Sequence, residues 1–91
     1  MRPVSYLITS FIEKTMNSKG LSIFITSEGK YLAMNEQYDT IYKFDLSFSD
    51  NDFSCQILAK TENGLTLKNS VNIPWSNGNA LRDFMEYIRQ L

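Results

Sequence analysis

Apolar residues recur along this chain with two different periods. Near both ends they are three to four residues apart, and in the middle they are two residues apart. The longer spacing lines one face of a helix, whereas the shorter one lines one face of a strand. The pattern therefore predicts a helix at each end of the chain with β-strands between them.

The first segment predicts a helix over about residues 4–18. Pro3 suits the first turn, because its missing N–H would have no intrahelical partner there, and Gly20 is a natural left-handed stop. The apolar face of this helix is formed by Val4, Leu7, Ile8, Phe11, Ile12, Thr15 and Met16.

Alternating residues from Leu21 to Met34 predict two strands, joined by a two-residue turn at Glu28-Gly29. If the two strands pair regularly from that turn, Ile25 lies opposite Leu32. This pairing places Phe24 and Ala33 together on the opposite face of the sheet.

The segments 42–48 and 53–59 predict the most strongly patterned hairpin. A slip of one residue would turn its whole apolar set toward water, so the register is well specified. The expected pairs are Phe48 with Phe53, Leu46 with Cys55, Phe44 with Ile57 and Tyr42 with Ala59.

After residue 59 the sequence predicts a second hairpin with a three-residue loop, Glu62-Asn63-Gly64, in which Gly64 has a left-handed backbone. A tight Asn-Gly turn would mix the two faces of the sheet, whereas the longer loop pairs Ala59 with Leu67, Cys55 with Val71 and Phe53 with Ile73. Pro74 cannot donate a ladder hydrogen bond, so the last strand is expected to end at about Ile73.

A second amphipathic helix is expected from there to the C-terminus. Its capping oxygens come from Ser76, Asn77 or Asn79, and its apolar face is formed by Leu81, Phe84, Met85, Ile88 and Leu91. The chain is thus predicted to be one α+β domain over residues 1–91, a five-stranded antiparallel meander flanked by an N-terminal and a C-terminal helix.

Composition narrows the class of protein. The net charge is −1. A nonspecific nucleic-acid binder would have a large excess of basic residues, and a DNA mimic would be strongly acidic. No apolar run is long enough to cross a bilayer, and the N-terminal segment lacks the features of a signal peptide. With a single cysteine, a cytoplasmic location is expected.

Candidate chemistry is sparse. The chain has no histidine, the commonest general base and metal ligand. Cys55 is expected to be buried in a strand, and Asp50-Asn51-Asp52 suits a turn better than a calcium loop. We therefore expect no enzyme activity, no metal, no cofactor and no small-molecule substrate.

The sheet face opposite the predicted core is the feature of interest, because it is not wholly polar. Its apolar members are expected to be Phe24, Tyr31, Ala33, Ile41 and Leu58. Either a terminal helix crosses to cover this cluster, or the cluster binds another molecule or a second copy of the chain.

Two further aromatic residues are candidates for a contact surface. Tyr38 precedes the third strand, and Trp75 follows Pro74 at the exit from the sheet. Tryptophan and tyrosine are enriched where interfaces concentrate their energy, although Trp75 could equally fill the junction between the last strand and the second helix.

These features predict a small binding protein that acts through protein–protein contact, such as a regulator, an inhibitor or an immunity-type protein, and a homodimer is compatible with them. The alternative is a module that binds single-stranded nucleic acid on its sheet face. That alternative relies on Lys43, Lys60, Lys68 and Tyr31.

Overall fold

The computed structural model describes residues 4–91 and confirms the predicted fold class. A single antiparallel sheet with the strand order β1-β2-β3-β4-β5 is flanked by one helix at each end of the chain. The elements are α1 (Val4–Ser18), β1 (Ser22–Ser27), β2 (Lys30–Met34), β3 (Ile41–Phe48), β4 (Asp52–Thr61), β5 (Gly64–Pro74) and α2 (Gly78–Arg89).

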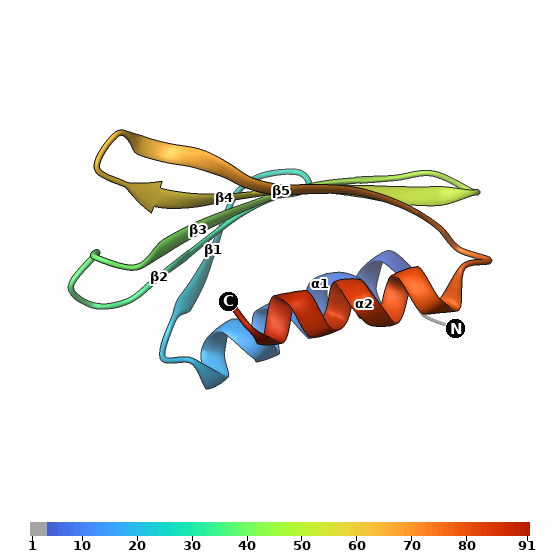
Figure 1. Cartoon of the computed structure of the whole chain (residues 1–91). Coiled ribbons are helices and arrows are strands. Elements are labelled where there is room, and N and C mark those ends of the chain that lie inside the picture. Colours follow the sequence, from blue (N-terminus) through green and yellow to red (C-terminus); the bar gives the residue numbers. More distant parts are fainter. Residues whose placement is uncertain (1–3) are drawn as a thin grey trace.

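Both helices lie on the same face of the sheet (Figure 1). We call the face they cover the inner face and the opposite one the outer face. The core forms between the helices and the inner face, and its buried members are Ile8, Ile12, Met16, Leu21, Ala33, Phe44, Leu46, Phe53, Cys55, Ile57, Ile73, Phe84 and Ile88. Neither helix crosses over, so the covering helix considered for the outer cluster is not found.

Helix α1 differs from its prediction in which residues it buries. Its bounds match, but Val4 and Leu7, expected on the buried face, are 47% and 57% exposed. The buried residues are Ile8, Ile12 and Met16. The first turn of α1 thus contributes little to the core.

The hairpin of β3 and β4 confirms the predicted register. All four expected pairs are present, from Phe48 with Phe53 to Tyr42 with Ala59. Phe44 and Ile57 face each other and are fully buried. This pair shows which faces of β3 and β4 lie toward the helices.

The pairing of β1 with β2 differs from the prediction by one residue. The two-residue turn at Glu28-Gly29 is present, because Ser27 pairs with Lys30, but a bulge at Thr26 shifts the ladder beyond it. Ile25 therefore pairs with Tyr31 rather than Leu32. An extra residue on one strand reverses the facing of the partner strand.

The tip of the hairpin of β4 and β5 was also predicted wrongly. The loop has two residues, since Thr61 pairs with Gly64, although Gly64 has the expected left-handed backbone with φ 94°. Lys68 is an unpaired bulge residue, which restores the predicted pairing of Cys55 with Val71. Between the tip and the bulge, Leu67 pairs with Leu58 instead of Ala59.

Candidate protein-binding surface

One line of paired residues crosses the outer face from edge to edge. Phe24 pairs with Leu32, Leu32 with Lys43, Lys43 with Leu58, and Leu58 with Leu67. Directly paired residues point to the same side of a sheet. These five residues, one from each strand, form what we call the outer row: Phe24, Leu32, Lys43, Leu58 and Leu67.

More apolar residues lie beside the outer row. Met34 pairs with Ile41, and Lys60 pairs with Leu65, on the same face. Phe24, Leu65 and Leu67 are 49%, 42% and 59% exposed. The outer face thus presents large apolar side chains to solvent across its whole width.

The rest of the outer face is polar. Lys30 forms an ion pair with Asp45, with 3.7 Å between Nζ and Oδ2. On β5, the side-chain amide of Asn72 donates hydrogen bonds to Ser54 Oγ at 2.8 Å and to Asp52 Oδ2 at 3.2 Å. The apolar residues are therefore concentrated at one end of the strands rather than scattered over the face.

Tyr38 lies at the border of this apolar region. Tyr38 is 60% exposed and its backbone is left-handed, with φ 57°. Lys60 Nζ donates a hydrogen bond of 2.7 Å to the Tyr38 carbonyl oxygen, and Asn35 Oδ1 accepts from the backbone N–H groups of Asp39 and Thr40. The loop that carries Tyr38 is thereby held beside the end of β4.

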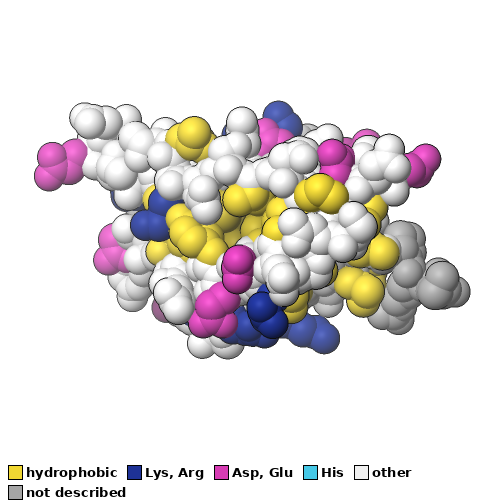
Figure 2. All heavy atoms as spheres, turned by 45° about the vertical axis from the view of Figure 1, so that its right-hand side comes forward, with side chains coloured by type: hydrophobic (Ala, Val, Ile, Leu, Met, Phe, Trp, Pro, Cys, Tyr) yellow, Lys and Arg dark blue, Asp and Glu magenta, His cyan; other side chains and the backbone are white. Residues whose placement is uncertain are grey.

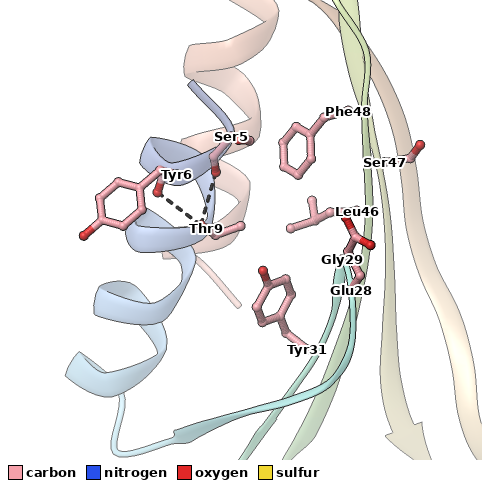
Figure 3. Close-up of a pocket in the computed structure, with 9 residues that line it drawn as sticks. All are labelled: Ser5, Tyr6, Thr9, Glu28, Gly29, Tyr31, Leu46, Ser47 and Phe48. Atoms are coloured by element: carbon pink, nitrogen blue, oxygen red, sulfur yellow. Dashed lines mark hydrogen bonds between the residues drawn. The ribbon is translucent and has the colours of Figure 1, made fainter. Parts of the chain in front are cut away.

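Two residues expected on the outer face lie on the inner face instead. The bulge at Thr26 aligns Leu32 with Phe24, so Tyr31 and Ala33 point toward the helices. Ala33 is fully buried. Tyr31 faces α1 across a cleft (Figure 3), which leaves Phe24, Ile41 and Leu58 as the predicted cluster members on the outer face.

The cleft between α1 and the sheet has a volume of about 580 Å³. Figure 3 shows Tyr31, Leu46 and Phe48 pointing into it from the sheet. Its polar groups are mostly hydroxyls, and the Thr9 hydroxyl donates within the helix to the carbonyl oxygens of Ser5 and Tyr6. Among residues 4–91, Glu28 supplies the one carboxylate in the lining of this cleft.

Trp75 lies in an aromatic cluster on the inner face. Its ring stacks on Phe53 with centroids 5.0 Å apart and on Phe48 at 6.3 Å, and Phe53 meets Phe84 of α2 edge-on. This arrangement matches the packing role considered from the sequence, in which Trp75 fills the junction between β5 and α2.

Apolar side chains also reach the surface between the sheet and the helices. Figure 2 shows them in a band across the middle of that view, with charged side chains around them. Between β5 and α2 the surface is hollowed by a cleft of about 440 Å³ lined by Val71, Ile73, Ala80 and Phe84 among others. These side chains belong to the core or pack against it.

The single thiol is buried in the core. Burial raises the pKa of Cys55 to about 12, and the negative charge of Asp45 adds to the shift. Within residues 4–91, no three His, Cys, Asp or Glu side chains are grouped to hold a metal ion. Over the same residues, neither helix has the length and apolar character needed to cross a bilayer.

Compared with protein-family models, with curated proteins and with solved structures, the chain gives no match.

Proposed function

We propose that this chain is a small binding protein that acts by protein–protein contact through its outer face. The observation that carries the proposal is the outer row, which spans all five strands on the face that both helices leave open. Exposed apolar surfaces of this kind mark interaction sites in monomeric proteins. A regulator or inhibitor that covers a surface of its partner fits this arrangement.

The charges in this region indicate the chemistry of the partner. Lys43 stands between Leu32 and Leu58 in the outer row, and Lys60 pairs with Leu65 beside it. A matching surface would place apolar side chains against the leucines and carboxylates opposite the two ammonium groups. Such charge pairing sets orientation and association rate more than affinity.

Binding of single-stranded nucleic acid is supported less well. Lys43 and Lys60 do share the outer face with Phe24, but Tyr31 points toward the helices. Phe24 is then the one aromatic side chain that the strands of residues 4–91 place on the outer face. Sequence-tolerant binding of bases uses several stacking rings.

The test compares two neighbouring positions on β5. Leu67 and Thr66 are both exposed, but Leu67 pairs with Leu58 on the outer face and Thr66 with Ala59 on the inner face. Immobilised wild-type chain, Leu67→Glu and Thr66→Glu are each used to capture proteins from an extract of the source cells. We expect one protein to be retained by wild type and Thr66→Glu and lost with Leu67→Glu.

Lys43→Glu provides the second arm of that experiment, because it reverses a charge within the outer row. It should weaken retention of the same protein. Equal retention by all four chains would contradict the proposal. Retention that nuclease treatment abolishes, with binding of a labelled oligonucleotide that weakens steeply with salt, would favour the nucleic-acid alternative.

A further inference from the structure

We propose that two copies of this chain associate through β1, which pairs antiparallel with β1 of the second copy to make one continuous sheet. This inference goes beyond the proposed function, because it concerns the edge of the sheet and needs no other protein. It depends on three features of β1: an open edge, a self-complementary sequence and opposite charges at its two ends.

The open edge follows from the strand order. Within residues 4–91, β1 pairs with β2 alone, so its other side presents backbone N–H and C=O groups to solvent. Natural edge strands are usually protected by charged residues, proline or bulges. Strand β5, at the other edge, has Lys68 in a bulge and ends at Pro74, whereas Ser22–Ser27 contains neither a charge nor a proline.

The bulge in β1 does not block this edge. It lies at Thr26, near the end of the strand, and leaves Ile23, Phe24 and Ile25 in a regular ladder. Phe24 is 49% exposed, and Ile25 is 71% exposed although it is on the inner face. A second strand laid along this edge would cover both side chains.

The sequence of β1 reads nearly the same in both directions about Phe24. A two-fold axis through Phe24 pairs Phe24 with its counterpart on the outer face, and it pairs Ile23 with the second copy's Ile25 on the inner face. An axis between two residues would pair an outer residue with an inner one, which the pleat forbids. An axis through Ile25 would place Phe24 against Thr26, so Phe24 is the better centre.

In this arrangement both faces of the sheet continue from one copy into the other. On the outer face, the Phe24 pair would join the outer rows of the two copies end to end. On the inner face, Ile23 and Ile25 line a cleft of about 270 Å³ beneath α1. The second copy would set Ile23 beside Ile25 at the mouth of that cleft, where α1 leaves Ile25 uncovered.

The charges at the ends of β1 complement each other. Lys19 precedes the strand and Glu28 follows it. Antiparallel pairing brings the start of one β1 to the end of the other, so the lysine of each copy comes to the same end as the glutamate of its partner. Like charges do not meet at either end, and opposite charges favour this orientation.

The first experiment measures the dissociation constant of the dimer by sedimentation equilibrium for the full chain. Ile25→Lys places a charge against the second copy's Ile23 and removes no core side chain, because Ile25 is exposed. The matched control, Thr66→Lys, adds the same charge at an exposed site of β5. We expect a wild-type dimer whose dissociation constant rises at least about tenfold in Ile25→Lys and is unchanged in Thr66→Lys.

The second experiment tests the register. In Phe24→Cys the two new thiols would face each other and form a disulfide on mild oxidation. In Ile25→Cys they would be about 8 Å apart between Cα atoms, beyond the reach of a disulfide. The wild-type chain is the control, because its only thiol, Cys55, is buried.

A disulfide-linked dimer of Phe24→Cys with little from Ile25→Cys supports the proposal. A wild-type chain that stays monomeric, equal weakening by both lysine variants, or preferential linkage of Ile25→Cys overturns it. Failure here is distinguishable from failure of the proposed function. Leu67→Glu, which tests the outer row, lies on the strand farthest from β1 in the sheet.

Discussion

The indole N–H of Trp75 donates a hydrogen bond of 2.8 Å to the carbonyl oxygen of Ser49. The backbone N–H of Trp75 donates a second one, of 2.9 Å, to the carbonyl oxygen of Asn51. The two bonds tie the junction of β5 and α2 to the turn between β3 and β4. Because α2 follows immediately, this contact sets where the second helix begins to pack on the sheet.

Two substitutions of Trp75 separate the contribution of its indole hydrogen bond to stability from that of its ring stacking. Trp75→Phe keeps an aromatic ring against Phe48 and Phe53 but loses the donor, which should lower the free energy of unfolding by about 1 kcal/mol. Trp75→Ala also loses the stacking and should cost about 3 kcal/mol. Urea denaturation measures both, and equal losses would show that the stacking contributes nothing.

Two asparagines at the N-terminus of α2 allow the contribution of the helix cap to stability to be measured. Asn77 Oδ1 accepts a hydrogen bond of 3.0 Å from the backbone N–H of Ala80, whereas Asn79 Oδ1 accepts only from the exposed side chain of Arg82. Asn77→Ala should lower the free energy of unfolding by about 1 kcal/mol. Asn79→Ala, the matched control, should change it little; a larger loss there would reassign the cap.

The β3–β4 hairpin could be predicted because only one register keeps its apolar residues together. Every second residue from Tyr42 to Phe48 and from Phe53 to Ala59 is apolar or nearly so, and the residues between them are mostly polar. A shift by one position would expose the whole set. The burial of Phe44 and Ile57 follows directly from that pattern.

The two bulges could not be predicted, because the alternation of apolar and polar residues along β1 and β5 shows no break at either bulge. Leu65, Leu67, Val71 and Ile73 keep one alternating phase along β5, although the Lys68 bulge sends the first two to the outer face. In β2 both faces are apolar, so either register looked reasonable. Tyr31 was therefore assigned to the wrong face.

Because of these bulges, only part of the outer face was predicted correctly from the sequence. Phe24, Ile41 and Leu58 lie on the outer face as expected, but Leu32 and Leu67 were missed. If Val71 stayed opposite Cys55 and β5 had no bulge, Leu67 would pair with Ala59 on the inner face. The outer row is thus a product of backbone irregularities, and its role in binding stays a prediction.

Cys55 should make stability fall in alkaline solution. Its folded pKa of about 12 lies above the ordinary value of 9.0 for a cysteine thiol, so the unfolded chain loses this proton first. The neutral thiol therefore stabilises the fold fully below pH 9, and this contribution decreases as pH rises from 9 toward 12. Urea denaturation between pH 7.5 and about 10.5 should show a steeper decline for wild type than for Cys55→Ala. Parallel declines would contradict the assignment.

Gly29 should be the least replaceable glycine of the chain's left-handed turns. Its carbonyl oxygen accepts a hydrogen bond of 2.7 Å from the N–H of Leu46, so the β1–β2 turn rests on the backbone of β3. A Cβ at this position would overlap the Leu46 carbonyl oxygen. Gly20 has a similar backbone, with φ 81° against 74°, but open space around it.

The comparison of Gly29→Ala with Gly20→Ala therefore separates backbone strain from steric overlap. Both variants carry the cost of a left-handed alanine, about 1 kcal/mol. Gly29→Ala must also move the turn away from β3 and lose the hydrogen bond, which adds about 1 kcal/mol or more. Urea denaturation gives the two free energies, and amide exchange at Leu46 should accelerate in Gly29→Ala alone. Equal losses with an unchanged exchange rate would mean that the turn adapts without leaving β3.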